Sequence, residues 1–170
     1  FFTDDMDTNI LIEKKQVKIG QVKRDRGMGI RVLVKKADGT TTGFSYLTDL
    51  SRNATTEAAK RAVATARVRE ADKDLKSFQM KARAGNVGDI FDRKVVRTDA
   101  SDLVDIGESM LKESSSDSRV STVSGNIYSS ISRIAVANSL GVSASYGSTA
   151  FGGNMYVVAE SNGSIGVGWE

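Results

Sequence analysis

Four carboxylates recur at every third residue in one stretch of this sequence: Asp99, Asp102, Asp105 and Glu108. Carboxylate oxygens are good Mg²⁺ ligands, and two carboxyl groups can act as general acid and general base. Like charges in a block are more often the solvated face of a helix, and the first of them also favour the positive end of the helix dipole. We therefore predict an exposed acidic helix face here, not a catalytic site.

A second candidate is Gly27-Met28-Gly29, which has the spacing that opens a dinucleotide-binding loop. That loop needs glycine or alanine at position 32, where the sequence has Val32, and it needs a helix next to receive the phosphate. An alternating strand pattern follows instead. The two glycines are therefore predicted to form a tight bend at the start of a strand.

The remaining catalytic chemistry is limited by composition. The chain of 170 residues has no histidine, cysteine or proline. Zinc would therefore find only carboxylate ligands, and a nucleophile activated by histidine is impossible. Ser109–Lys112 matches a Ser-x-x-Lys pattern, but its companion motifs are missing and its middle residues are needed for helix packing. We assign no catalytic, cofactor-binding or metal-ligating residue to this sequence.

Charge is distributed unevenly along the chain. Residues 1–97 hold 21 Lys and Arg against 13 Asp and Glu, a net charge of +8, and residues 98–170 hold 3 against 8, a net charge of −5. This contrast predicts two structural units. The basic cluster lacks interleaved aromatic residues and any helix-turn-helix or zinc-finger pattern, so a solvated sheet face is predicted and no nucleic-acid partner is expected. Its members are Lys14, Lys15, Lys18, Lys23, Arg24 and Arg26.

Neither a membrane nor a secretory route is expected. No apolar run approaches the roughly 18 residues of a membrane helix, and no signal peptide is visible. The lack of cysteine agrees with a cytoplasmic location. The chain begins at Phe1 without methionine and stops at Glu170 directly after an apolar alternation, so we expect a piece of a longer protein.

The first elements that must position any site are strands. Residues 9–14, 17–22 and 28–36 alternate in polarity, and Asp38-Gly39 predicts a hairpin after the third. A two-residue turn would pair Ala37 with Thr40. We prefer a three-residue loop, which pairs Lys36 with Thr40 and places Val32 opposite Phe44, because this register matches the apolar faces.

A helix follows the hairpin. Residues 51–56 are rich in capping residues, and the helix should continue to about Glu70, supported by an ion pair of Glu57 with Arg61. Its narrow stripe of small residues implies close packing on a sheet. The stripe is formed by Ala58, Ala59, Ala62, Val63 and Ala66.

A connector with one possible edge strand is predicted for residues 72–97, and Thr98-Asp99 opens a second helix that ends at residues 114–117. Its apolar positions are Leu103, Ile106, Met110 and Leu111. From Arg119 onward, five Ser/Gly-rich strands are predicted, at residues 120–125, 127–139, 141–147, 155–161 and 164–169. Residues 143–146 could accept an extended peptide as an added strand, although an ordinary solvent-facing sheet is the simpler reading.

Together these elements predict an α+β protein: an antiparallel sheet with a packed helix in an N-terminal domain, then a second α+β domain with an antiparallel sheet. The predicted domains are residues 1–75 and 98–170, joined by a connector over residues 76–97. The second domain is expected to be truncated at its C-terminal end.

The order of motifs resembles the TldD/PmbA family, the so-called modulators of DNA gyrase. "GMGIRVLV", "GFSYLTDLS" and "TEAAKRAVATAR" resemble that family's first domain, and "IAVANSLGVSASYGSTAF" with "MYVVAESNGSIGVGWE" resembles its middle domain. The helix that leads into the family's first strand is missing here. The resemblance covers residues 9–170.

This resemblance implies a metallopeptidase system. TldD-type subunits bind zinc through a His-Glu-x-x-x-His motif and a later cysteine in a C-terminal domain, and they cleave unfolded or extended peptides. PmbA-type subunits lack these ligands and pair with the TldD type. The present chain would then be a non-catalytic N-terminal and middle part, inactive alone, that serves as scaffold, dimer contact and access path for an extended peptide. A homodimer or a TldD/PmbA-type heterodimer is implied, with no cofactor in this chain and zinc in the missing domain of a TldD-type parent.

Two other functions remain open at this point. One is a regulatory module that binds a toxin, gyrase or nucleic acid through the basic first unit. The other is an independent hydrolase that uses the carboxylates between Asp99 and Glu108.

Overall fold

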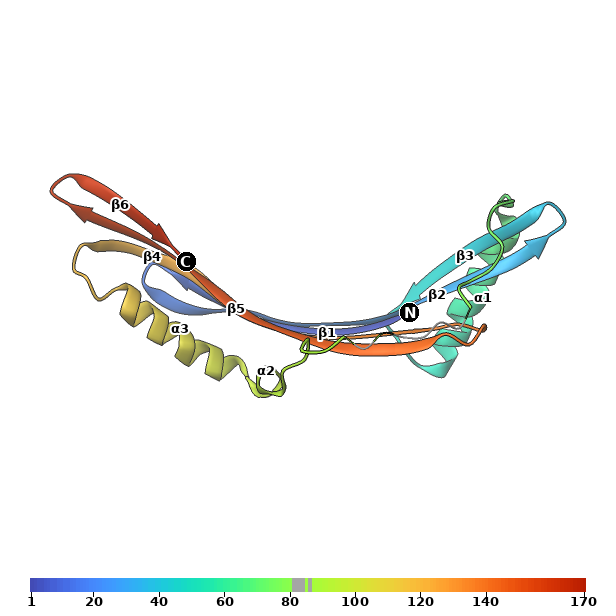
Figure 1. Ribbon diagram of the computed structural model, residues 1–170, viewed down its shortest axis with the longest axis horizontal. Helices are drawn as coiled ribbons and strands as arrows, with labels where there is room; N and C mark the ends of the chain where they lie inside the picture. The colour runs from blue at the N-terminus through green and yellow to red at the C-terminus, as the bar shows by residue number, and fades with distance from the viewer. Residues whose placement is uncertain (81–84, 86) are drawn as a thin grey trace. The chain divides into compact units, whose positions relative to one another are not determined.

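The computed structural model of the protein describes residues 1–80, 85 and 87–170 (Figure 1). Its elements in chain order are β1 (Phe2–Glu13), β2 (Gln16–Lys36), β3 (Gly39–Leu47), α1 (Arg52–Val68), α2 (Arg93–Arg97), α3 (Ala100–Ser114), β4 (Val120–Ala137), β5 (Ser143–Ser161) and β6 (Ser164–Trp169).

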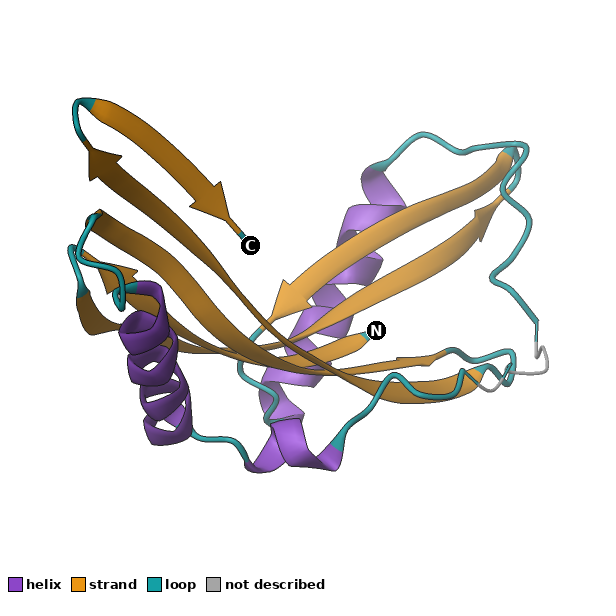
Figure 2. Cartoon of the chain, turned by 60° about the vertical axis from the view of Figure 1, so that its left-hand side comes forward, coloured by secondary structure: helices purple, strands orange, loops and turns teal. Residues whose placement is uncertain are grey.

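The strands form one six-stranded sheet in the order β3-β2-β1-β4-β5-β6, with β2–β3 and β5–β6 paired as antiparallel hairpins (Figure 2). The predicted α+β class is confirmed. No helix among the described residues has the length and apolar character needed to cross a bilayer.

Contacts divide the chain into two compact units, each assembled from separate stretches. Unit 1 consists of residues 1–4, 25–87 and 133–146, and unit 2 of residues 5–24, 88–132 and 147–170. The strands β1, β2, β4 and β5 contribute residues to both. The sequence domains at residues 1–75 and 98–170 stay a prediction.

The strands are longer and fewer than predicted. The expected strands at residues 17–22 and 28–36 are parts of β2, which continues through the exposed charged residues 23–26. The five strands predicted after Arg119 are three, because Ser- and Gly-rich stretches that suggested turns lie inside β4 and β5. Charged and small residues do not end a strand when their side chains face solvent or a close neighbour.

Helix α1 forms as its local signals predict. Ser51 is the N-cap, and its hydroxyl oxygen accepts a hydrogen bond from the Ala54 amide at 3.3 Å. The buried stripe consists of Ala58, Ala62 and Ala66. The predicted ion pair differs, because the Glu57 carboxylate contacts Lys60 at 2.8 Å instead of Arg61.

Both hairpin registers considered from the sequence are wrong. Lys36 pairs with Gly39, and Val32 lies opposite Gly43. Gly43 faces α1 so closely that an added Cβ would lie 1.8 Å from the Ala62 carbonyl oxygen. The helix therefore requires the smallest residue opposite Val32, and the aromatic residues of β3 fall on the other face.

Helix α3 covers a separate apolar core in unit 2. Its Leu103 is fully buried, whereas Ile106 is 37% exposed and Gly107 occupies the buried position instead. The prediction for Ile106 was therefore wrong. The core residues of unit 2 are Ile10, Ile12, Leu103, Val120, Val123, Ile127 and Met155.

The connector between the helices contains α2 and, in its described part, no regular strand. Asp72 forms an isolated antiparallel bridge with Thr40, which is all that the described residues show of the predicted edge strand. Part of the predicted connector, residues 81–84 and 86, lies outside the described residues.

Candidate functional site

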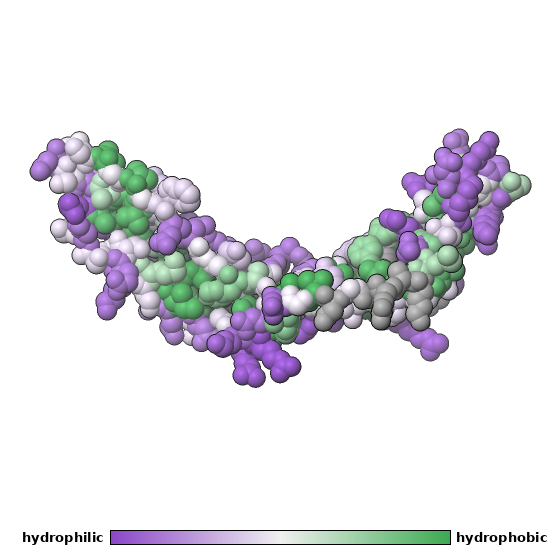
Figure 3. Space-filling view, in the orientation of Figure 1, coloured by the Kyte–Doolittle hydropathy of each residue, from purple (hydrophilic) through white to green (hydrophobic). Residues whose placement is uncertain are grey.

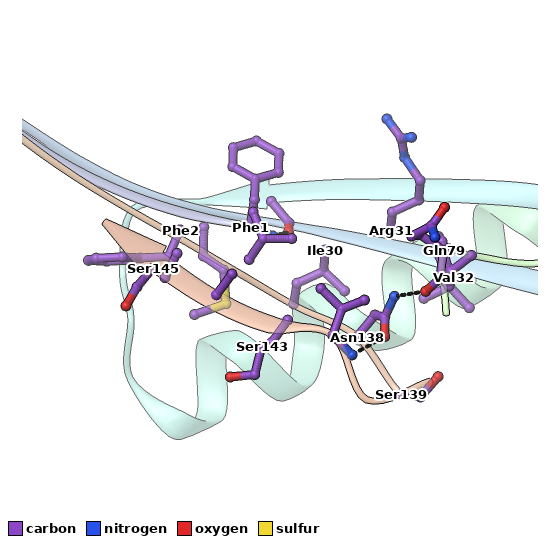
Figure 4. A pocket seen from close by; sticks show the side chains of 18 of the residues that line it. Phe1, Phe2, Ile30, Arg31, Val32, Gln79, Asn138, Ser139, Ser143 and Ser145 are labelled. Atoms are coloured by element: carbon purple, nitrogen blue, oxygen red, sulfur yellow. Dashed lines mark hydrogen bonds between the residues drawn. The ribbon is translucent and has the colours of Figure 1, made fainter. Parts of the chain in front are cut away.

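A groove of about 1040 Å³ lies entirely within unit 1 (Figure 4). Most of its lining is apolar, and the side chains come from the starts of β1 and β5, the middle of β2, the end of β4 and the connector. The lining residues are Phe1, Phe2, Met28–Leu33, Phe44, Phe78, Gln79, Ala135–Ser139 and Val142–Ser145.

The groove begins where β1 begins. The Phe1 amino nitrogen donates to the Gly29 carbonyl oxygen, and the Gly29 amide donates to the Phe1 carbonyl oxygen, both at 2.8 Å. This is a hydrogen-bonded pair of an antiparallel ladder.

Strand β4 runs beside β1 on its other side. The Ser130 hydroxyl donates to Asp7 at 2.6 Å, and the Ser132 hydroxyl donates to Asp5 at 2.5 Å. Extending this antiparallel register places Val136 beside Phe1.

The groove is lined by side chains from both faces of the strands. Phe1 and Arg31 point to one side of the strands, while Ile30 and Val32 point to the other (Figure 4). All four line the same groove.

Aromatic residues cover the face opposite α1. The Phe1 and Phe44 rings stack with centroids 6.4 Å apart and planes inclined by 12°. A Cβ at Gly29 would lie 2.3 Å from the Phe1 ring, and one at Gly27 would lie 1.9 Å from the Tyr46 hydroxyl. The glycine pair lies inside β2 and not at a bend before a strand, so that prediction was wrong, and the glycines make room for two rings.

The far wall of the groove is a turn built on Asn138. Its side-chain oxygen accepts from the amides of Leu140 at 2.9 Å and Val142 at 3.1 Å, and its side-chain nitrogen donates to the Gln79 carbonyl at 2.7 Å. Gly141 has a φ of 89°, which favours glycine. One amide therefore fixes the β4–β5 turn and holds the connector against it.

Arg31 is the one charged side chain among the described residues that line the groove. It is exposed and lies opposite Phe44 in the β2–β3 register. No acidic side chain in the described part of the chain forms an ion pair with it. The shifted carboxyl pKa values belong to other places: a hydrogen bond from Lys60 lowers the pKa of Glu57, and hydrogen bonds from Arg119 hold the pKa of Asp117 well below its usual range.

The acidic residues singled out in the sequence form no metal site. Asp99 caps α3 by accepting from the amides of Ser101 at 2.8 Å and Asp102 at 3.0 Å, and Asp102 accepts from the Asp99 amide at 2.9 Å. Asp105 and Glu108 are exposed, as predicted for a solvated helix face. Among the described residues, no group of three or more His, Cys, Asp or Glu side chains could hold a metal ion.

The remaining sequence candidates have structural roles. The Ser109 hydroxyl of the Ser-x-x-Lys match donates to the Asp105 carbonyl of its own helix at 3.0 Å. Lys18 forms an exposed ion pair with Glu13 at 3.1 Å, and Lys15 donates to the Val120 carbonyl at 2.5 Å.

Two of the sequence candidates contribute to the groove: the glycine motif, through Met28 and Gly29, and residues 143–146, through Ser143, Ala144 and Ser145. The aromatic Phe1-Phe2 pair, in a strand whose neighbour carries Gly27 and Gly29, is the signal of the groove in the sequence.

Family models match most of the sequence. The model described as PmbA/TldA metallopeptidase domain 1 matches residues 1–67, and the one described as the PmbA/TldA metallopeptidase central domain matches residues 93–170. The chain belongs to the PmbA/TldD metallopeptidase family. The resemblance noted in the sequence is therefore confirmed. No curated protein sequence matches the chain.

Solved structures share the fold of this PmbA/TldD-family chain. A putative modulator of DNA gyrase from Thermotoga maritima is similar with a TM-score of 0.75 at 13% identity, and TldE from Thermococcus kodakarensis with 0.73 at 14%. A putative modulator of DNA gyrase from Bacteroides thetaiotaomicron has a TM-score of 0.75 at 12%. Each comparison covers 99% of this chain but only 37–38% of the solved chain. The chain thus spans less than two-fifths of the length of these structures.

Proposed function

We propose that this part of a PmbA/TldD-family protein is non-catalytic and binds an extended peptide in the groove of unit 1. The zinc of an active parent would lie in another domain, because this chain has no histidine or cysteine to supply the ligands that the family uses.

The walls of the groove carry this proposal. The apolar residues Phe2, Ile30 and Val142 line it together with the polar residues Arg31, Ser143 and Ser145. An extended peptide would bury apolar side chains against these walls and form hydrogen bonds with the polar groups.

The size and lining of the groove agree with this role. Ligand sites typically enclose about 300–1000 Å³ and combine apolar walls with a few polar groups. At about 1040 Å³, this groove is at the upper end of that range, as an open site for several residues would be. A peptide held here in extended form would be ready for transfer to a catalytic domain.

Peptide titrations test this proposal without altering the protein. Binding of a dye-labelled extended peptide to the 170-residue chain is measured by fluorescence anisotropy, then repeated with derivatives N-methylated at alternate residues. A derivative that binds about tenfold more weakly has lost main-chain hydrogen bonds to the protein. No binding of the unmodified peptide would overturn the proposal.

Protein variants locate the binding site. Val136→Glu places a charge in the groove at a side chain that is 45% exposed and should abolish binding. Val68→Glu makes the same change in unit 1 at an 85% exposed side chain outside the groove and should leave binding unchanged. Equal effects of the two variants would place the peptide elsewhere. Stoichiometric zinc or peptide cleavage by the purified chain would contradict the non-catalytic assignment.

A second proposed role is contact with another family subunit through β6. All six residues of this edge strand are exposed, and none carries a charge. Ile165 is 70% exposed, Val167 57% and Trp169 84%, and Figure 3 shows hydrophobic side chains at the surface of the β5–β6 hairpin. Exposed apolar side chains that cluster on a surface often mark a contact with another protein.

Sedimentation of the chain tests this second role. If these side chains contact a second subunit, Val167→Lys should shift a dimer to monomer because a charge disfavours an apolar contact. Val68→Lys is the matched control and should leave the dimer intact. A wild-type chain that stays monomeric, alone and with a family partner, would contradict this role.

A further inference from the structure

We propose that the face of the β2–β3 hairpin directed away from α1 binds single-stranded nucleic acid, with bases stacked on its aromatic rings and phosphates paired with its basic side chains. This role goes beyond peptide binding in the groove. RNA and DNA strands offer the same bases and phosphates to such a surface. We call the surface the aromatic–basic face, and it consists of Arg31, Lys35, Phe44 and Tyr46.

The pairing of β2 with β3 places these four side chains on one face. Arg31 lies directly opposite Phe44. Tyr46 follows Phe44, and Lys35 follows Arg31, at an even spacing in the same strand, so each pair projects to one side. The intervening residues are directed to α1, since a Cβ added at Gly43 would meet that helix. The aromatic–basic face is therefore the side of the hairpin away from α1.

Both aromatic rings are accessible for stacking. Phe44 is 45% exposed and Tyr46 is 51% exposed. An atom added at Gly27 would lie 1.9 Å from the Tyr46 hydroxyl, so the ring lies directly on the backbone of β2. The two residues alternate along β3, which places their Cα atoms about 7 Å apart. Successive bases of an extended strand can span this spacing.

The charge of unit 1 favours a polyanion. Residues 1–4, 25–87 and 133–146 hold 14 Lys and Arg against 8 Asp and Glu, a net charge of +6, whereas the residues of unit 2 hold 10 against 13, a net charge of −3. Most of the basic cluster at residues 14–26 belongs to unit 2. The sequence argument against a nucleic acid concerned that cluster, which lacks aromatic residues. The structure brings a different basic set together with aromatic rings.

The two cations of the face are available to phosphates. Arg31 and Lys35 are exposed, and no carboxylate in the described part of the chain forms an ion pair with either. Their Cα atoms lie about 13 Å apart along β2. Phosphates on either side of two stacked nucleotides can therefore reach one cation each.

This combination favours a nucleic acid strand over other anions. An acidic peptide would pair with the two cations but leave both rings without a partner. A double helix keeps its bases stacked inside, so the rings would meet no base face. A single strand engages the rings through its bases and the cations through its phosphates, as single-strand-binding surfaces do.

Oligonucleotide titrations test the proposal on the unaltered chain. Dye-labelled oligothymidine and oligouridine of about twelve nucleotides should both bind in fluorescence anisotropy, with an affinity that falls as salt rises. An abasic strand with the same number of phosphates should bind about a hundredfold more weakly, because two stacking contacts of about tenfold each are lost. Absence of binding by both oligonucleotides, or equal affinity for the abasic strand, would overturn the proposal.

Substitutions at Tyr46 assign the stacking to one ring. Tyr46→Ala should weaken oligothymidine binding about tenfold, while Tyr46→Phe keeps the ring and should bind as the wild type does. Tyr156→Ala is the matched control, because that tyrosine is 43% exposed and belongs to unit 2. The proposal fails if Tyr46→Ala binds as tightly as Tyr156→Ala.

A charge substitution tests the phosphate contact. Lys35→Gln should reduce the slope of log affinity against log salt by about 0.7, the value for one phosphate of a single strand. Lys60→Gln makes the same change in unit 1 on α1, which packs on the opposite face, and should leave the slope unchanged. Equal slopes for the two variants would refute a phosphate contact at Lys35.

These measurements distinguish the aromatic–basic face from the proposed peptide site. Tyr46 and Lys35 do not line the groove, so Tyr46→Ala should bind the extended peptide as the wild type does. A labelled polyglutamate peptide that binds as tightly as oligothymidine would overturn the assignment to nucleic acid. Circular dichroism shows whether each variant keeps the wild-type fold, and the abasic comparison tests the proposal without any substitution.

Discussion

The two long helices contact the sheet in opposite ways. α1 packs on β3 through three alanines and the backbone of Gly43, so that helix and strand meet almost without side chains. α3 packs on its part of the sheet through a large side chain, Leu103, which meets Ile10 and Ile127. Each contact lies within one unit.

The two contacts therefore differ in how much room they leave for an added atom. An atom added at Gly43 would lie 1.8 Å from the Ala62 carbonyl oxygen, a distance that only movement of the backbone can relieve. An atom added at Gly107 of α3 would lie 3.4 Å from the Ile127 side chain, which is ordinary contact. One buried glycine is required by packing and the other is not.

This contrast explains why the hairpin register could not be found from apolar matching alone. The close approach of α1 favours small residues on β3, which forces Phe44 and Tyr46 to the opposite face. The Phe44 ring then stacks on Phe1 and lines the groove. The tight contact on one face thus determines the aromatic surface on the other.

The largest effect is expected for Gly43→Ala. The added Cβ would force α1 away from β3 and open the packing of Ala62 and Ala66. We expect the free energy of unfolding to fall by about 4 kcal/mol, at the upper end for overpacking. Urea denaturation followed by circular dichroism measures it. A loss below about 1 kcal/mol, within the range of ordinary surface changes, would show that α1 can shift freely.

Leu103→Ala tests the other contact by removing atoms. Leu103 is fully buried, so the substitution should leave a cavity beside Ile127 and lower the free energy of unfolding by about 3 kcal/mol. Ile106→Ala on the same helix removes a side chain that is 37% exposed. It is the control and should lower the free energy of unfolding by less than about 1.5 kcal/mol, because its side chain buries far less apolar surface in the wild type. Similar losses for both variants would mean that α3 is not anchored at Leu103.

The same comparison shows which features were predictable from sequence. Both helices were found because caps and apolar spacing are local: Ser51 and Asp99 begin them, and Leu103 lies at the predicted buried position. Strand ends were misjudged because residues that usually mark loops also occur within long strands. The charged residues 23–26 and the serines of β4 lie inside strands, where neighbouring strands supply the hydrogen bonds.

The groove could not be predicted from the sequence for a different reason. It depends on the sheet order, which places β2 and β4 on either side of β1 and thereby brings Arg31 and Val136 to one cavity. These residues are distant in the sequence and carry no shared motif. Only Gly27 and Gly29, which leave room for the Tyr46 and Phe1 rings, gave a signal that could have been used to predict the groove from the sequence.

Gly107→Ala is expected to stabilise the protein slightly, in contrast to the same change at Gly43. The nearest atoms to the added Cβ are 3.4–3.7 Å away, on Ile127 and Val17, so no clash arises. Alanine is favoured over glycine inside a helix by about 1 kcal/mol. Urea denaturation should show a gain of about 0.5–1 kcal/mol. A fall in the free energy of unfolding comparable to that of Gly43→Ala would mean that α3 is packed as tightly as α1. It would contradict the difference between the two helix contacts.

The smallest effects concern one exposed ion pair in each unit. In unit 2, the backbone amide, Nε and Nη2 of Arg119 donate to Asp117 at 2.9, 3.0 and 2.6 Å, and these bonds hold the pKa of Asp117 well below its usual range. In unit 1, a single bond from Lys60 lowers the pKa of Glu57. The pair with more hydrogen bonds should therefore respond more strongly to loss of its cation.

Carbon-13 NMR titration of the two carboxyl groups measures this difference. Arg119→Ala should raise the pKa of Asp117 toward its ordinary value, by more than Lys60→Ala raises that of Glu57. Because the folded pKa of Asp117 lies below the unfolded one, its contribution to stability is present above the unfolded value and is lost as pH falls through the folded value. Acid unfolding of Arg119→Ala should therefore differ from wild type only at low pH, and the difference should be small because the pair is exposed. An Asp117 pKa that does not move on loss of Arg119 would refute the assignment of the shift to this pair.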